Sequence, residues 1–138
     1  MSVVRFTYTG IRVTNLKRSL DFYQKVLGMK VILRGKTELG GVYAHLKSPN
    51  SLQRLELNWY PVGNRYYTKY RKSEELDHLA FWVRDVHAEF DSLVRRGAEP
   101  AIAPFREGAY ELAFLKDPDG IWIELLGKFR ASKKKRQS

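Results

Sequence analysis

The stretch HLAFWVRDVHAEFDSLVRRG, residues 78–97, repeats the plan of YTGIRVTNLKRSLDFYQKVLG, residues 8–28. Each copy begins with alternating apolar residues, which are typical of a half-buried strand, and then passes through a polar turn. Each continues with apolar residues spaced three or four apart, which predicts an amphipathic helix. Both helices are expected to end at a glycine, Gly28 and Gly97. The chain therefore contains a strand followed by a helix twice.

Three further strands are predicted after each helix, separated by turns rich in Gly, Pro, Asn and Asp. They cover residues 30–33, 42–47 and 54–60 in the first copy, and 100–102, 110–115 and 121–126 in the second. The last strand of each copy carries a glutamate between aliphatic residues, Glu56 in LEL and Glu124 in IEL. Strands disfavour glutamate, so its occurrence at corresponding places in both copies points to a function. The sequence predicts an α+β fold of two tandem βαβββ modules.

The predicted organisation is one domain over residues 1–129, followed by a basic tail at 130–138 that we expect to be disordered. The domain divides into module 1 at 4–61, a linker loop at 62–74 and module 2 at 75–128. The net charge of +10 is concentrated at the C-terminal end, where Lys128 and the tail contribute six basic residues. The remainder has 19 basic and 15 acidic side chains, so no specific nucleic-acid partner is predicted.

Composition excludes several classes of protein. The 138 residues are 43% hydrophobic, which is enough for a core. No apolar run approaches the roughly 18 residues of a membrane helix, and the first residues show no signal-peptide pattern. Cysteine is absent, so the chain has no disulfides and no thiol chemistry of its own. We expect a cytoplasmic protein without a membrane partner.

Strand alternation decides which side chains share the face opposite the core. These faces are predicted to carry Tyr8, Arg12, Glu56, Tyr60, His78, Trp82, Trp122 and Glu124. If a helix covers the apolar face of each sheet, the other faces meet in a cavity that gathers Glu56, His78 and Glu124. One imidazole and two carboxylates suit a divalent metal, and inward carboxylates need a cation or protons. The alternatives are a structural His78 and glutamates that pair with Arg12 and Arg54.

At these residues the chain resembles the vicinal oxygen chelate superfamily, and within it the glyoxalase I enzymes (lactoylglutathione lyases). The stretches that carry the resemblance are GIRVTNLKRSLDFYQKVLGM, LELNWY, LDHLAFWV and FLKDPDGIWIELLGK. The resemblance implies that the two modules curl into half-barrels around a metal held by four residues on the first and last strands. Three positions match by residue type, namely Glu56, His78 and Glu124. Tyr8 takes the fourth position, where the family usually has His or Gln.

The family pattern also implies the metal. Zinc or nickel is expected, with manganese, cobalt or iron as further candidates. Glutamate at position 56 favours glyoxalase I over related epimerases, and the ligand set differs from the two His and one carboxylate of the ring-cleaving dioxygenases. His45 is a possible substitute for the missing fourth ligand, although a hydrogen-bonded strand histidine is the alternative. His87 is expected to be exposed.

The resemblance implies an isomerase or lyase that acts on the hemithioacetal of a 2-oxoaldehyde such as methylglyoxal. The reaction would pass through an enediolate, with Glu124 or Glu56 moving a proton between adjacent carbons. We favour Glu124, because its neighbour Trp122 excludes water. Two other functions remain open on the same fold: a drug-sequestering binding protein and a ring-cleaving extradiol dioxygenase.

The small-molecule partner is expected to be a thiol adduct. Arg12 matches an arginine with which the family holds a glutathione carboxylate, but Tyr60 replaces the family's asparagine, so glutathione itself is not predicted. Trp82, Trp122 and Tyr66 are further candidates for substrate contact. The loop YPVGNRYYTKYRK, residues 60–72, either grips an anionic ligand or packs on the partner subunit of an expected homodimer.

Overall fold

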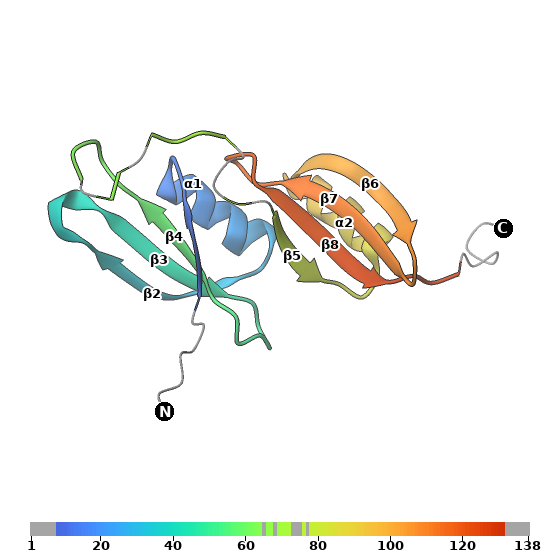
Figure 1. Ribbon diagram of the computed structural model, residues 1–138. Helices are drawn as coiled ribbons and strands as arrows, with labels where there is room; N and C mark the ends of the chain where they lie inside the picture. The colour runs from blue at the N-terminus through green and yellow to red at the C-terminus, as the bar shows by residue number, and fades with distance from the viewer. Residues whose placement is uncertain (1–7, 65, 68, 73–75, 77, 132–138) are drawn as a thin grey trace, which may run out of the picture. The chain divides into compact units, whose positions relative to one another are not determined.

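The computed structural model describes residues 8–64, 66–67, 69–72, 76 and 78–131 of the 138 (Figure 1). The predicted tail from residue 132 onward and positions 65, 68 and 73–74 of the predicted linker lie outside these residues. The chain forms two compact units, Met1–Asp77 with Pro118–Gly120, and His78–Asp117 with Ile121–Ser138. No helix of the described residues is long and apolar enough to cross a membrane.

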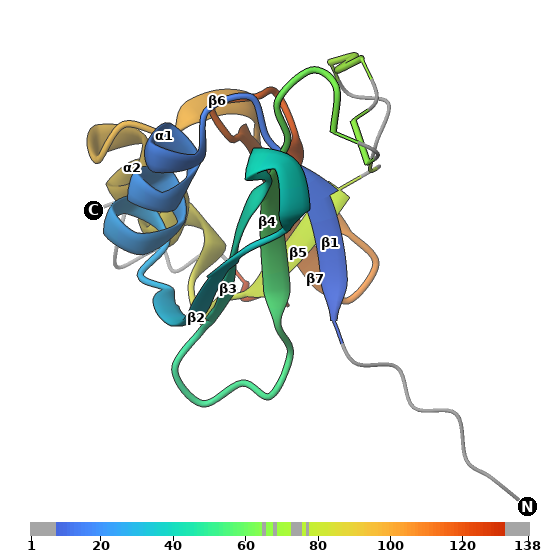
Figure 2. The same cartoon turned by 90° about the vertical axis from the view of Figure 1, so that its left-hand side faces the viewer.

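The first unit contains one four-stranded sheet in the order β1-β4-β3-β2. Its elements are β1 (Thr9–Arg12), α1 (Leu16–Asp21), a π-helical turn η1 (Phe22–Val26), β2 (Lys30–Lys36), a 3-10 turn η2 (Glu38–Gly40), β3 (Val42–Lys47) and β4 (Leu55–Trp59). β1 runs parallel to β4, and the other pairs are antiparallel. Figure 2 shows α1 lying to one side of the strands of this sheet.

The second unit repeats this topology, with the sheet order β5-β8-β7-β6. Its elements are β5 (His78–Trp82), α2 (Val86–Arg95), β6 (Glu99–Glu107), β7 (Tyr110–Lys116) and β8 (Trp122–Lys128). β5 runs parallel to β8, and α2 packs on β6, β7 and β8. The prediction of an α+β fold with two tandem βαβββ modules is confirmed.

Both helices begin and end by the same local chemistry. The side chains of Asn15 and Asp85 cap α1 and α2 by accepting hydrogen bonds from the backbone N–H three residues later, each at 3.0 Å. Gly28 and Gly97 follow the helices with φ of 74° and 113°, a conformation that costs little only for glycine. The helical segment of each module therefore stops just before the predicted glycine, after the π turn η1 in the first module and after α2 in the second.

Two elements differ from the prediction. The first helix does not stay α-helical to Gly28, because η1 inserts a π turn in which the N–H of Leu27 bonds the carbonyl of Phe22. In this wider turn the side chains of Phe22 and Val26 are buried in the core, whereas Leu27 is only half-buried. β6 is much longer than the predicted 100–102. It is an edge strand whose pairing is irregular between Ile102 and Phe105, so the missing N–H of Pro104 is tolerated.

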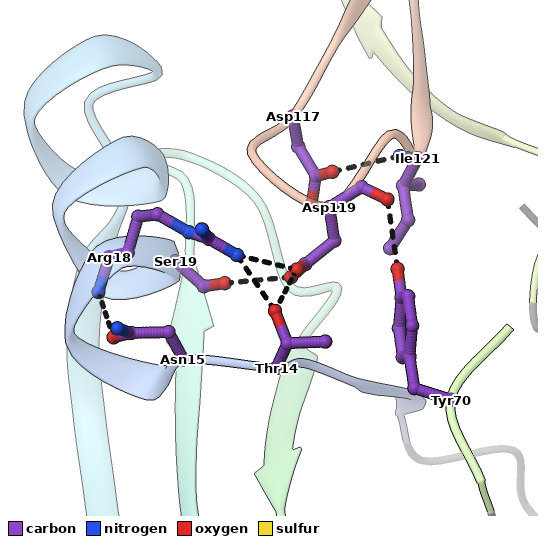
Figure 3. A network of polar contacts seen from close by, with 8 residues as sticks. All are labelled: Thr14, Asn15, Arg18, Ser19, Tyr70, Asp117, Asp119 and Ile121. Atoms are coloured by element: carbon purple, nitrogen blue, oxygen red, sulfur yellow. Dashed lines mark hydrogen bonds and ion pairs between the residues drawn. The ribbon is translucent and has the colours of Figure 1, made fainter. Parts of the chain in front are cut away.

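The turn between β7 and β8 supplies a buried, hydrogen-bonded carboxylate to the first unit (Figure 3). Asp119, whose side chain is 1% exposed, accepts hydrogen bonds from the hydroxyls of Thr14 and Ser19 and from the guanidinium of Arg18, the last at 2.8 Å. The hydroxyl of Tyr70 donates to the backbone carbonyl of Asp119 at 2.9 Å. The buried charge is stable because each of its partners donates a hydrogen bond.

We predict that Asp119→Ala lowers the free energy of unfolding by about 2 kcal/mol, because the fully buried Ser19 hydroxyl loses its acceptor and Arg18 loses its counter-ion. Chemical denaturation measures this change. Asp21→Ala is the matched control, since Asp21 is more exposed and its ion pairs within the described residues are with Lys17 and Lys25 on the helix surface. Equal destabilisation by the two variants would contradict the assigned role of Asp119.

Candidate functional site

Glu56 is the second residue of β4 and has a donor at each oxygen. His45 Nε2 is 2.9 Å from Oε2, and Asn58 Nδ2 donates to Oε1 at 2.9 Å. His45 is placed by the antiparallel register of β3 and β4, in which it pairs directly with Glu56. These are the partners that the described residues give Glu56, so the alternative pairing with Arg12 or Arg54 is not found in this part of the chain.

A glycine makes room for this carboxylate. Gly10 pairs with Glu56 across the parallel β1–β4 ladder. A Cβ added at residue 10 would lie 3.1 Å from Oε1 of Glu56 and 3.4 Å from Nδ2 of Asn58. The absence of a side chain at Gly10 therefore keeps space free beside one carboxylate oxygen.

Asn58 is oriented by a second polar contact. Its Oδ1 accepts a hydrogen bond from the hydroxyl of Tyr60 at 3.2 Å, which leaves Nδ2 to donate to Glu56. Burial, and after it the nearby Glu56 carboxylate, raise the pKa of Tyr60 above its ordinary value of 10.0. The phenol therefore stays protonated at neutral pH and remains a donor to Asn58.

Tyr8, the predicted fourth ligand, contacts His45 through its ring. The two ring centroids are 4.6 Å apart, and Tyr8 is 40% exposed. The geometry places Tyr8 beside the His45–Glu56 pair. Its role as a ligand stays a prediction.

A cavity of about 180 Å³ opens in the first unit next to this network. It is lined by Arg12, Val13, Thr14, Asn58, Trp59, Tyr60, Tyr67 and Tyr70. The buried Nε of Arg12 has no hydrogen-bond partner among the described residues. Because Arg12 lines the cavity, its guanidinium is the charged donor group of the cavity wall. Tyr66, a predicted substrate contact, is 53% exposed and lies with its ring 5.7 Å from that of Tyr60.

In the second unit, His78 and Glu124 come together as predicted from strand alternation. His78 Nε2 is 3.2 Å from Glu124 Oε1, although the two residues are 46 positions apart. The parallel register pairs Glu124 with Ala80, so a small residue again lies opposite the glutamate. A small residue therefore lies opposite the glutamate in both modules, whereas the histidine comes from β3 in the first and from β5 in the second.

The surroundings of Glu124 are aromatic. Phe114 pairs with Glu124 across β7–β8, and its ring lies 6.3 Å from that of His78 and 5.5 Å from that of Trp122. Trp82, the other predicted aromatic contact on this sheet, is 60% exposed and lies 6.4 Å from the ring of Tyr110. The surroundings of Glu124 are therefore apolar, whereas those of Glu56 are rich in hydrogen bonds.

The four predicted metal positions form two sets. Tyr8 and Glu56 belong to the first unit, and His78 and Glu124 belong to the second. In neither unit do three His, Asp or Glu side chains of the described residues come close enough to hold an ion. Convergence of the two sets on one cation stays a prediction. The remaining histidine, His87, is exposed as expected and pairs with Glu111 at 2.8 Å.

The residues present fit a divalent cation. Two carboxylates and an imidazole are donors that zinc and nickel accept. The space beside Gly10, which a Cβ would fill, leaves room for a further partner at Oε1 of Glu56. From the sequence no role was assigned to Asn58, and the pairing of His45 with Glu56 was missed.

Comparison with known proteins identifies the family of the chain. The model of the Glyoxalase/Bleomycin resistance protein/Dioxygenase superfamily matches residues 5–125. A lactoylglutathione lyase of Neisseria meningitidis serogroup A is 33% identical over 136 residues, which cover 91% of each chain. A probable lactoylglutathione lyase of Vibrio cholerae is 33% identical over 139 residues, covering 91% of this chain and 92% of the relative.

Solved structures give the same result. The trypanothione-dependent glyoxalase I of Leishmania major superposes with a TM-score of 0.71 at 32% identity, covering 91% of this chain and 87% of that one. An antibiotic-binding protein from Streptomyces sp. CB03234 has a TM-score of 0.74 at 22% identity over 94% of this chain and 99% of that one, which shows the fold alone. The chain belongs to the Glyoxalase/Bleomycin resistance protein/Dioxygenase superfamily.

Proposed function

We propose that the chain is a metal-dependent lyase of the glyoxalase I type, whose substrate is the hemithioacetal of a thiol and a 2-oxoaldehyde such as methylglyoxal. One observation carries the proposal. Each sheet presents a glutamate that lies opposite a small residue, Gly10 or Ala80, and has a histidine nitrogen within 3.2 Å of a carboxylate oxygen. The relatives named lactoylglutathione lyase at 33% identity support the same reaction class.

Glu56, His78 and Glu124 would hold the cation, with Tyr8 as a candidate fourth ligand. A bound divalent cation supplies Lewis-acid stabilisation of negative charge on the two adjacent oxygens of the substrate. Zinc or nickel suits a set of carboxylate and imidazole donors. A cation shared by the two glutamates would also compensate their charges, which are costly on partly buried sheet faces.

The two glutamates differ in how free they are to accept a proton. Both oxygens of Glu56 accept hydrogen bonds, one from His45 and one from Asn58. Glu124 has one partner in the described part of the chain, His78 on Oε1, and lies beside the aromatic rings of Phe114 and Trp122. We therefore assign Glu124 as the base that removes a proton from one substrate carbon and returns it to the next.

Arg12 and its cavity suit the anionic end of the thiol. The guanidinium of Arg12, whose Nε has no hydrogen-bond partner among the described residues, is a charged donor. Tyr60, Tyr67 and Tyr70 line the same cavity and provide ring surfaces and hydroxyl groups. Tyr60 occupies the position of the family's asparagine and points its hydroxyl at Asn58. We infer that the thiol is a carboxylate-bearing molecule and that its binding differs in detail from that of glutathione.

We predict that the purified protein takes up about one divalent ion per chain when it is incubated with zinc or nickel. Metal analysis after removal of loosely bound ions measures the ratio. His78→Ala should lose the ion, because it removes a ligand, whereas the exposed His87→Ala should keep it. No uptake by the unaltered chain would contradict the proposed function.

Glu124→Gln should lower turnover roughly 10²–10⁴-fold, because the amide keeps the size of the side chain but is not a base. The assay is methylglyoxal isomerisation with several carboxylate-bearing thiols. Glu111→Gln is the matched control, since Glu111 is a paired carboxylate on the neighbouring strand β7 that contacts His87. Full activity of Glu124→Gln would move the role of base to Glu56. Full metal occupancy without turnover on any thiol would favour a binding protein or a dioxygenase.

A further inference from the structure

We propose that His45 is a positioning residue that donates a hydrogen bond from Nε2 to Glu56 and fixes the plane of its carboxylate, and that His45 is not itself a metal ligand. The inference rests on the proposed function, in which Glu56 holds the cation. It concerns a histidine outside the ligand positions that the family pattern supplies.

The first step is the direction of the hydrogen bond. His45 Nε2 lies 2.9 Å from Oε2 of Glu56, and an ionised carboxylate can only accept. Toward an ionised Glu56, which is the form that binds a cation, Nε2 is the donor and carries the hydrogen. This assignment removes Nε2 as a ligand, because its lone pair is used by the proton.

The second step is the burial of the ring. His45 is 5% exposed, and its Nδ1 is buried without a hydrogen-bond partner among the described residues. A ligand nitrogen has to direct its lone pair at a space that the cation can enter. With Nε2 bonded to Glu56 and Nδ1 enclosed, neither nitrogen meets this requirement. The earlier alternative of His45 as a substitute ligand is therefore disfavoured by the geometry.

The third step is the restriction of the ring by its neighbours. Tyr8 packs against the imidazole at 4.6 Å between centroids, and Tyr43 lies edge-on at 6.1 Å. The antiparallel pairing of β3 with β4 places His45 directly opposite Glu56 on the neighbouring strand. An imidazole held in this way has little rotational freedom left to lose when the hydrogen bond forms.

The fourth step is the effect on Glu56. His45 donates to Oε2 of Glu56 and Asn58 donates to Oε1, so both carboxylate oxygens are fixed by hydrogen bonds. The space above Gly10 remains beside Oε1. Such outer partners of a ligating carboxylate typically contribute 10–100-fold to metal affinity or activity. Tyr8, at the position where the family usually has a ligating imidazole or amide, would then act by packing on the imidazole that orients Glu56.

The experiment compares two substitutions of His45. His45→Gln keeps an amide N–H near the place of Nε2, and His45→Leu keeps apolar volume but has no donor. We expect His45→Leu to bind zinc about 10–100-fold more weakly in a competition titration with a chromogenic chelator, and His45→Gln to stay within about threefold of the unaltered protein. His87→Leu removes a histidine from a similar pair with Glu111 and should leave zinc affinity unchanged.

Folding of each variant is checked by thermal unfolding of the metal-free protein. Unchanged zinc affinity in folded His45→Leu would overturn the proposal. Equal losses in His45→Gln and His45→Leu would also overturn it, because they would show that the imidazole itself binds the ion. Rescue by glutamine alone is the result expected of a positioning donor.

A second measurement remains decisive if zinc does not bind or if His45→Leu does not fold. The nitrogen chemical shifts of the His45 ring in the metal-free protein report which nitrogen carries the hydrogen. We expect the Nε2–H form in the unaltered chain and loss of this preference in Glu56→Ala. An Nδ1–H form would overturn the proposal. The Nε2–H form without zinc binding would support the role of His45 while contradicting the proposed metal-dependent function.

Discussion

The close contact between a histidine and a strand glutamate is the interaction on which the polar face of each sheet depends. Glu56 and Glu124 are each flanked by buried aliphatic residues, so alternation fixes both carboxylates on the face opposite the core. A partly buried carboxylate is costly without donors, and each has a histidine within 3.2 Å. Gly10 and Ala80, the partners of these glutamates on the neighbouring strands, leave the space that the carboxylates need.

The two modules have the same topology but have diverged in chemistry. Around Glu56 the partners are polar, and the chain from Tyr60 through Asn58 to Glu56 and His45 holds the carboxylate by both oxygens. Around Glu124 the neighbouring side chains are aromatic, and in the described part of the chain its carboxylate contacts one histidine, His78. A carboxylate held at both ends suits a fixed ligand. A carboxylate with one donor and apolar neighbours suits a group that must change protonation state during turnover.

Most of the fold was predictable because its signals are local. Apolar periodicity, the caps Asn15 and Asp85, and the glycines that end the helices identify both modules in the sequence. The His78–Glu124 contact was also predictable, since both residues lie on adjacent parallel strands of a repeated unit. The His45–Glu56 pair was not, because it depends on the register of the β3–β4 hairpin, which the 48–54 connection sets and residue types do not reveal. The π turn at Phe22 likewise depends on packing against the sheet rather than on helix propensity.

We propose that one imidazole, that of His78, binds the cation, while that of His45 holds Glu56. X-ray absorption spectroscopy of the zinc- or nickel-loaded chain tests these two roles most directly, because scattering from imidazole rings counts the histidines bound to the ion. We expect one imidazole, with the remaining ligands oxygen, and a loss of the imidazole signal in His78→Ala. Two imidazoles would show that His45 has turned to the ion. A signal that persists in His78→Ala would show that the site lies elsewhere in the chain. Either result would contradict the proposed roles of His78 and His45.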